Sequence, residues 1–170
     1  MNRKKTAALI GASTFTLLVG CGVPETPSPS ASQGQEARDG KLGFTVRDVS
    51  QVDSVGDPYD PFAYQKAKGV FEVIRLTVRN VGNESQSFDA FAQKLVINGK
   101  QFDHNLDASG NVDTKVSHSV SHNPSLQSDA VVVFDVPSGS PLGVLEVHDS
   151  MFSSGATIDL VGAIVDPALS

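Results

Sequence analysis

Apolar and polar residues alternate along much of the chain from Leu42 onward, and a two-residue repeat is typical of β-strands rather than helices. Leu42, Phe44 and Val46, for example, are separated by Gly43 and Thr45. Long stretches with the 3.6-residue repeat of an amphipathic helix are not seen. Strands are therefore predicted over residues 42–46, 74–78, 95–97, 132–136, 144–147 and 158–161, with a weaker one over 116–122.

Turn-forming residues separate these strands. Asn98-Gly99 lies between the apolar residues at 95–97 and the run 100–102, and it predicts a tight hairpin because both residues tolerate a positive φ. Short strands separated by Gly, Pro and Asn indicate an all-β fold, an immunoglobulin-like antiparallel β-sandwich, over residues 41–165. The chain has no Trp and a single Cys, so the Cys–Trp–Cys core of immunoglobulin domains is absent.

The N-terminus carries the pattern of a lipoprotein signal peptide. Basic residues at 3–5 precede an uncharged, mostly apolar stretch at 7–19, which is too short to span a bilayer. Residues 18–21, Leu-Val-Gly-Cys, resemble the bacterial lipobox. The resemblance implies a signal peptide over residues 1–20, cleavage between Gly20 and Cys21, and lipidation of the Cys21 thiol. The alternative is an ordinary secretory signal in which the cysteine lies at the cleavage point by chance.

Residues 21–40 are predicted to form a disordered linker behind the lipidated cysteine. They are rich in Pro, Ser and other polar residues and have few apolar side chains to bury, so ordering them would cost more entropy than burial returns. The linker would act as a tether between membrane and domain, or have no role. Without the three basic residues at 3–5, ten basic residues stand against 19 acidic ones, which gives −9 and argues against a nucleic-acid partner.

Several segments resemble the DUF4352 domains. They are the strand and turn at 69–82, the hairpin at 94–100, and Asn123-Pro124 followed by the strand at 131–137. Residues 148–155 resemble a loop of actinobacterial lipoproteins in that family. The resemblance covers most of residues 41–162. It implies a telokin-like or MPT63-like sandwich on secreted or lipid-anchored bacterial proteins, and it supplies no catalytic residues.

Three histidines are weak candidates for a metal site. His118 and His122 share one face of a strand but lie about 13 Å apart, so a bend and a third ligand such as His104 would be needed. Solvated polar residues beside a turn are the simpler interpretation. The segment 107–113 has alternating oxygen side chains like a calcium loop, but its glycine is misplaced and position twelve is His118, so an ordinary loop is expected.

The segment 57–64, Asp-Pro-Tyr-Asp-Pro-Phe-Ala-Tyr, is the main candidate for partner binding. It lies in a connection expected to run from about Ser54 to Lys68, and it holds Tyr59, Phe62 and Tyr64. Exposed aromatic side chains on loops are common recognition elements. The alternative is that these rings fold back and cap one end of the sandwich.

Motifs of hydrolases, zinc proteases and phosphate-binding loops are missing from the sequence, so no catalytic residue, metal or cofactor is predicted. The favoured function is a non-enzymatic binding module, anchored by its lipid to the extracytoplasmic face of the cell membrane. Its partner would be an envelope protein or a small ligand. A metal-dependent or hydrolase-like envelope enzyme and a purely structural lipoprotein remain alternatives.

Overall fold

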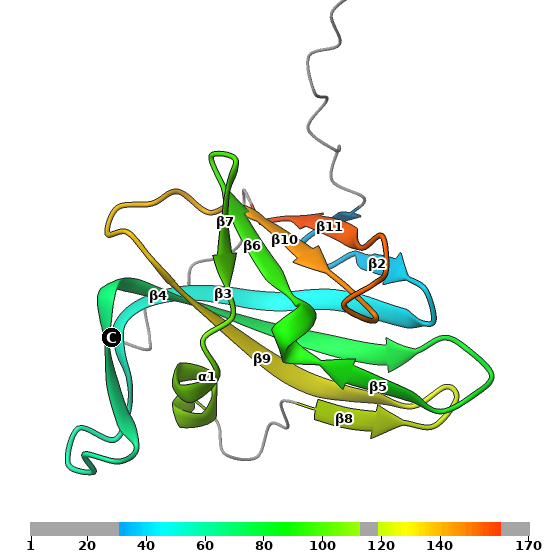
Figure 1. The fold of residues 1–170 in the computed structure, drawn as a ribbon, viewed down its shortest axis with the longest axis horizontal. Helices are drawn as coiled ribbons and strands as arrows, with labels where there is room; N and C mark the ends of the chain where they lie inside the picture. Colours follow the sequence, from blue (N-terminus) through cyan, green and yellow to red (C-terminus); the bar gives the residue numbers. More distant parts are fainter. Residues whose placement is uncertain (1–30, 113–118, 161–170) are drawn as a thin grey trace, which may run out of the picture.

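A computed structural model describes residues 31–112 and 119–160. The predicted signal peptide, its cleavage site at Gly20, the lipidation site Cys21 and the candidate ligand His118 lie outside these residues. The predicted antiparallel β-sandwich is confirmed (Figure 1). The elements are β1 (Ala31–Ser32), β2 (Glu36–Asp39), β3 (Leu42–Gly56), β4 (Tyr64–Asn80), β5 (Gln86–Asp89), η1 (Ala90–Ala92), β6 (Lys94–Ile97), β7 (Lys100–Asp103), α1 (Leu106–Val112), β8 (Ser119–His122), β9 (Gln127–Val136), β10 (Val144–Val147) and β11 (Ala156–Asp159).

Two sheets face each other in the sandwich. One has the strand order β1-β11-β10-β6-β7 and the other β2-β3-β4-β9, while β5 and β8 form a separate pair. All pairings are antiparallel except β1 with β11. The hairpin predicted at Asn98-Gly99 joins β6 to β7, and both residues have the expected positive φ, 51° and 75°.

The main core lies between the two sheets. The inward residues of β3, β4 and β9 meet those of β6, β10 and β11, and each fully buried aliphatic or Phe side chain contributes about 1.5–3 kcal/mol. A second cluster lies on the outer face of β3, β4 and β9, where Ala108 of α1 covers Phe71, Val73 and Val133. Both faces of β9 are therefore buried, which explains its unbroken apolar run at 130–134.

The hairpin of β3 and β4 is longer than expected. The connection predicted from about Ser54 to Lys68 is limited to residues 57–63, because Ser54 pairs with Lys66 and Gly56 with Tyr64. Two register shifts in the pairing of β3 with β4, between Val46 and Asp48 and between Val52 and Ser54, interrupt the ladder and bend it. The end of the hairpin therefore turns away from the sandwich, at the lower left of Figure 1.

Two other expectations were wrong. The disordered linker was expected to continue to residue 40, but residues 31–39 include β1 and β2, which pair with β11 and β3 and bury Ala31 and Ala37. Residues 107–113 were expected to form a loop, but α1 covers 106–112. Its first turn is capped by Asn105, whose side-chain oxygen accepts a hydrogen bond from the Ala108 amide at 3.0 Å.

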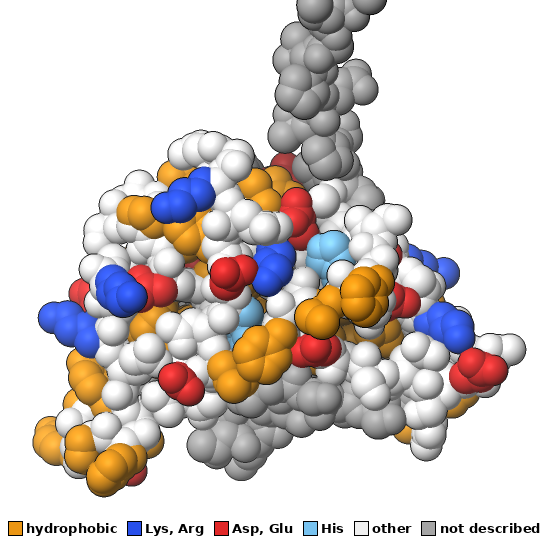
Figure 2. Space-filling model, viewed as in Figure 1, with side chains coloured by type: hydrophobic (Ala, Val, Ile, Leu, Met, Phe, Trp, Pro, Cys, Tyr) orange, Lys and Arg blue, Asp and Glu red, His pale blue; other side chains and the backbone are white. Residues whose placement is uncertain are grey.

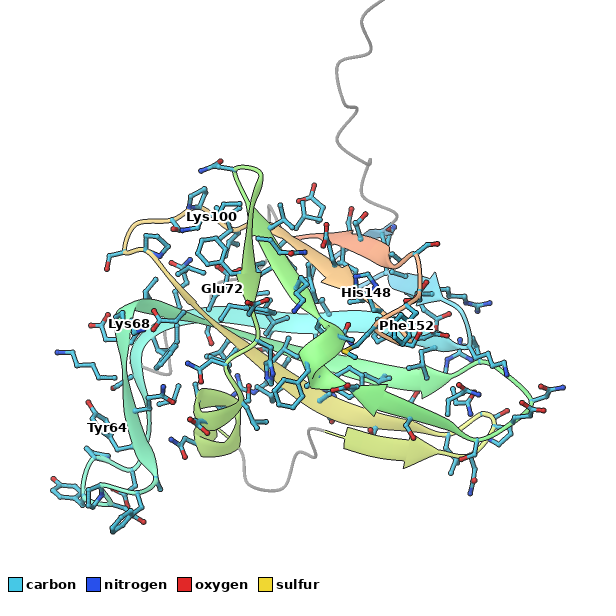
Figure 3. The ribbon with its side chains drawn as sticks, in the orientation of Figure 1. Tyr64, Lys68, Glu72, Lys100, His148 and Phe152 are labelled. Carbon is cyan, nitrogen blue, oxygen red and sulfur yellow. The ribbon has the colours of Figure 1, made fainter. Side chains whose placement is uncertain are left out.

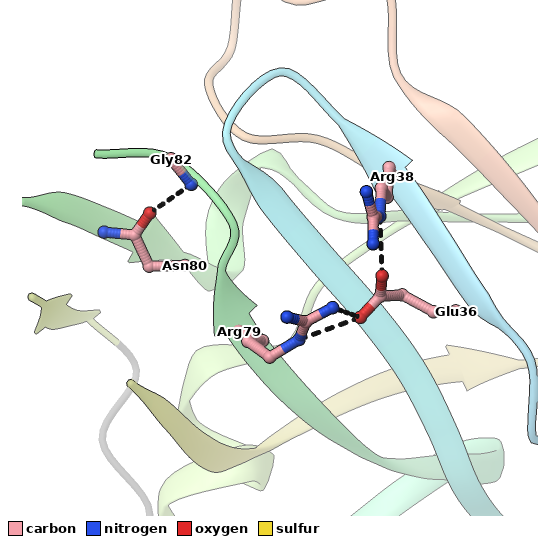
Figure 4. Close-up of polar contacts among 5 residues, drawn as sticks. All are labelled: Glu36, Arg38, Arg79, Asn80 and Gly82. Atoms are coloured by element: carbon pink, nitrogen blue, oxygen red, sulfur yellow. Dashed lines mark hydrogen bonds and ion pairs between the residues drawn. The ribbon is translucent and has the colours of Figure 1, made fainter. Parts of the chain in front are cut away.

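A polar clip fixes β2 to its sheet. The Glu36 carboxylate accepts hydrogen bonds from Arg38 at 2.6 Å and from Nε of Arg79 at 3.0 Å, reaching β4 across β3 (Figure 4). The Glu36 side chain passes over β3 at Gly43, which has no side chain. A Cβ atom at this position would lie 2.9 Å from the Glu36 carboxyl carbon. At the end of β4 the Asn80 side chain accepts a hydrogen bond from the Gly82 amide at 2.9 Å.

Candidate functional site

The tip of the β3–β4 hairpin, residues 57–63, consists of two successive turns of the same design. Each begins with Asp-Pro and places an aromatic residue third. Oδ1 of Asp57 accepts a hydrogen bond from the Tyr59 amide, and Oδ1 of Asp60 accepts one from the Phe62 amide, both at 2.9 Å. Backbone hydrogen bonds of 3.0 Å from Asp60 to Asp57 and from Ala63 to Asp60 close the turns. Proline presets φ at the second position, so the sequence itself orders the tip.

The two aromatic rings of the tip point into solvent. Tyr59 is 94% exposed and Phe62 is 96% exposed, while Tyr64, the first residue of β4, is 37% exposed. The alternative in which the rings fold back over the end of the sandwich is therefore wrong for Tyr59 and Phe62. Figure 2 shows the hydrophobic side chains of the tip standing out from the lower left of the molecule. An ordered loop that holds two large rings in water is a candidate recognition element.

Two hollows lie at the base of the tip, and α1 contributes to both. One of about 550 Å³ is lined by Phe62, Tyr64, Gln65, Leu106, Asp107, Gly110 and Asn111. The other, of about 450 Å³, has an apolar wall from β3, β4 and α1 with Arg75 and Asp57 at its polar side. Sequence reasoning missed both hollows because it expected a loop in place of α1.

A second exposed apolar loop, residues 148–155, joins β10 to β11. Met151 is 70% exposed and Phe152 is 94% exposed. The loop is fastened by buried polar side chains: Asp39 accepts hydrogen bonds from the Asp149 amide at 2.7 Å and the Gly155 amide at 3.1 Å. Gln93 both accepts from and donates to the His148 backbone, at 2.8 and 2.9 Å. Figure 3 shows His148 and Phe152 on this loop, well separated from Tyr64.

Of the three candidate metal ligands, the structure describes the side chain of His104 alone. His104 is 8% exposed, packs edge-on against Phe91 and Phe134, and shares a 2.6 Å hydrogen bond with the Ser109 hydroxyl. His118 and the side chain of His122 lie outside the described residues. Within residues 31–112 and 119–160, no three His, Cys, Asp or Glu side chains lie close enough to hold a metal ion.

Glu72 is a buried acid that sequence reasoning missed. It occupies the inward phase of β4, two residues before Ile74, and it is fully buried. Burial raises the pKa of Glu72 to about 7, although a 3.3 Å hydrogen bond from Gln51 acts to lower it. The sequence did contain a signal for this buried acid: Glu72 occupies the same alternating positions of the strand as the apolar residues Ile74 and Leu76. Because the carboxyl group is enclosed, it cannot reach a substrate in this conformation.

No helix in the described part of the chain is long and apolar enough to cross a bilayer. A comparison with curated proteins gave no match. Solved structures do match the fold. The yjhA protein from Bacillus subtilis has a TM-score of 0.60 at 14% identity, over 76% of this chain and 98% of that protein.

Two further structures support the same fold. MPT63, a secreted protein from Mycobacterium tuberculosis, has a TM-score of 0.56 at 17% identity, over 79% of this chain and 99% of that protein. A candidate lipoprotein, ycdA from Bacillus subtilis, has a TM-score of 0.56 at 15% identity, over 75% of this chain but 39% of its own. Identities this low show a shared fold and leave activity open.

The family model for the domain of unknown function DUF4352 matches residues 31–158. The match begins at β1 and ends within β11, so it includes nearly all of the described sandwich. It also covers the tip, the hairpin at 94–100 and the segment 148–155. The chain therefore belongs to the DUF4352 family.

Proposed function

We propose that this protein is a lipid-anchored binding module on the extracytoplasmic face of the membrane, and that it binds a partner protein through the tip at 57–63. The observation that carries the proposal is the exposure of Tyr59 and Phe62, 94% and 96%, on a loop ordered by its own hydrogen bonds. Aromatic side chains bury about 150–250 Å² each when a partner covers them, and they dominate many interfaces.

The order of the tip favours binding. An interface loses affinity when loops and side chains must be immobilised, at about 0.5–1.5 kcal/mol for each flexible side chain. Here Asp57 and Asp60 hold the backbone of both aromatic residues before any partner arrives, and two prolines restrict it further. Tyr and Phe also have few rotatable bonds, so little additional entropy is lost when the rings are covered.

The position of the tip agrees with an N-terminal anchor. The described chain begins at β1, the blue strand beside β11 at the upper edge of Figure 1, away from the tip at the lower left. Lipid on Cys21 would attach the protein through the segment that precedes β1, and the tip would remain free to meet a partner. The description of ycdA as a candidate lipoprotein and of MPT63 as secreted also supports an extracytoplasmic location.

We propose a binding role rather than catalysis. An enzyme needs titratable groups that converge on an accessible pocket. Glu72, whose pKa is raised by burial, is enclosed in the sandwich. His104 is 8% exposed between two Phe rings, so neither side chain is accessible to a substrate. The accessible features of the tip are instead aromatic, which suits association with a protein surface.

Site-specific photocrosslinking in cells tests the binding proposal. A benzophenone amino acid at position 59 or 62 is expected to give one discrete crosslinked protein, and the same group at position 152 is the matched control, because Phe152 is 94% exposed on another loop. Equal crosslinking from position 152, or none from either tip position, would contradict the proposal. Mass spectrometry of the mature N-terminus tests the anchor separately, because an unmodified Cys21 would exclude lipidation.

A further inference from the structure

The basic residues of the described chain divide into two groups. Six of the nine have a carboxylate within 4.0 Å, and they are Arg38, Lys41, Arg47, Arg75, Arg79 and Lys94. The other three, Lys66, Lys68 and Lys100, form no ion pair with any described residue. These three lysines are exposed, and they differ from the other basic residues of the described chain in having no carboxylate partner.

All three unpaired lysines line one hollow of about 560 Å³. Lys66 and Lys68 are two residues apart on β4 and share a face, while Lys100 begins β7 on the opposite sheet. Figure 3 shows Lys68 and Lys100 at the same end of the molecule. Gly69 lets the chain at 136–138 close the floor of the hollow, because a Cβ there would lie 2.1 Å from the Val136 carbonyl oxygen.

The charge of the hollow favours a doubly negative ligand. One carboxylate, Asp135, is among its lining residues. Its two oxygens already accept hydrogen bonds from the amides of Lys68 at 3.0 Å and Gly69 at 3.2 Å. Three ammonium groups and one carboxylate leave a net charge of +2. The Lys100 ammonium lies 5.0 Å from the centre of the Phe102 ring, a cation–π contact that holds the charge at the rim without neutralising it.

The lining also offers neutral hydrogen-bonding groups. Gln65 lies in the wall; its buried side-chain oxygen, which has no hydrogen-bond partner among the described residues, is an acceptor, so its NH2 group is the part that can donate to an anion. Asn105 and Ser138 contribute an amide and a hydroxyl group. Lysine ammonium groups bind phosphate as compact point charges, and neutral donors around them can complete the coordination of its oxygens.

We propose that the hollow between β4, β7 and residues 135–138 is a binding site for a phosphate monoester, held by the ammonium groups of Lys66, Lys68 and Lys100. A phosphate monoester carries a charge close to −2 at neutral pH and matches the net charge of the lining. The ligand is either a soluble phosphate monoester or a lipid headgroup with the same chemistry. The site does not depend on the tip, because neither Tyr59 nor Phe62 lines it.

Titration of the isotope-labelled full chain carrying Cys21→Ser with inorganic phosphate tests the site by NMR, with chloride at equal ionic strength as reference. The amides of Lys68, Gly69 and Ser138 are expected to shift saturably with phosphate and not with chloride. Lys68→Gln and Lys100→Gln are each expected to weaken phosphate binding about tenfold. Lys41→Gln is the matched control, because its ammonium pairs with Glu84 and does not line the hollow.

Sedimentation with vesicles distinguishes the two sources of the ligand. Binding to phosphatidylcholine vesicles that contain phosphatidic acid, lost in Lys68→Gln, would support the site and identify a headgroup. Saturable phosphate shifts without vesicle binding would support the site and identify a soluble ligand. The proposal is overturned if phosphate produces no saturable shift, or if Lys41→Gln weakens binding as much as Lys68→Gln. Tyr59→Ala with Phe62→Ala should leave phosphate binding unchanged.

Discussion

Tyr59 and Phe62 occupy equivalent positions in two consecutive turns, and each amide donates a 2.9 Å hydrogen bond to the aspartate two residues before it. The spacing of the rings along the chain is therefore fixed by a repeated Asp-Pro-aromatic unit. A partner that contacts both rings would meet a surface formed before binding.

Removal of either aspartate side chain should loosen the tip without unfolding the sandwich. An exposed hydrogen bond of this kind contributes about 0.5–1.5 kcal/mol, and that contribution is local to the turn. In Asp60→Ala, the heteronuclear NOE of the Phe62 amide should fall, while values in β4 stay the same. Asp53→Ala, on the exposed face of β3, is the control. An unchanged NOE at Phe62 would show that proline alone orders the turn.

Truncation of the two rings should leave stability nearly unchanged. Tyr59→Ala with Phe62→Ala is expected to change the free energy of unfolding by less than about 0.5 kcal/mol, because both side chains are almost fully exposed. Phe44→Ala, at a fully buried position between the sheets, should cost about 3–5 kcal/mol. Urea unfolding of the three proteins provides the comparison. A loss of several kcal/mol in the tip variant would mean that the rings pack against the domain.

Glu72 makes stability depend on pH. Its folded pKa, about 7, lies above the value of 4.5 for an ordinary glutamate, so the folded state holds the proton more tightly than the unfolded state. The favourable contribution is complete below pH 4.5 and is lost as the pH rises to about 7. The shift corresponds to a fall of roughly 3 kcal/mol in the free energy of unfolding across that window.

Glu72→Gln should remove this pH dependence, because the amide does not titrate. The variant should be more stable than the unmodified protein at about pH 8 and should lose the slope between about pH 5 and pH 7. Urea unfolding at several pH values measures both effects. A slope that persists in Glu72→Gln would assign the titration to another group.

Glu36 makes the free energy of unfolding depend on pH in the opposite direction to Glu72. Burial raises the pKa of Glu36, but hydrogen bonds from Arg79 and Arg38 outweigh it and hold the pKa below 4.5, so this contribution is lost only as the pH falls through that lower value. Gly43→Ala should displace the carboxylate and cost about 1–2 kcal/mol. In the Glu36→Ala background the same substitution should cost little. A double-mutant cycle in urea measures the coupling, and additive effects would contradict it.

Local patterns predicted the parts of the fold that local interactions determine. The strand at 144–147 and the Asn98-Gly99 hairpin lie where alternation and turn chemistry placed them. The strands within 31–39 could not be predicted from composition, because pairing with β11, β3 and the Arg79 side chain stabilises them. Helix α1 was missed because it consists of a single short segment covering an apolar patch on distant strands.

The candidate site was predictable to a similar extent. Tyr59 and Phe62, which each follow an Asp-Pro pair, indicated the tip, but their orientation depends on the bend at the two register shifts between β3 and β4. The hollow lined by Lys66, Lys68 and Lys100 could not be predicted from the sequence. Lys100 is more than 30 positions from the other two lysines, and only the fold brings them to one cavity. Glu72 could have been found from its inward phase, since a charged residue there conflicts with the apolar alternation.

In-cell chemical crosslinking and pull-down of the full chain provides the most direct test of the proposed function. The experiment would compare the unmodified protein with two double variants, Tyr59→Ala/Phe62→Ala and Met151→Ala/Phe152→Ala. The second variant is the control, because it removes an exposed apolar pair from the loop at 148–155. A specific partner recovered with the unmodified protein and the loop variant, but lost with the tip variant, is the predicted result. Recovery of the same partner with the tip variant would contradict the assignment of 57–63 as the binding site.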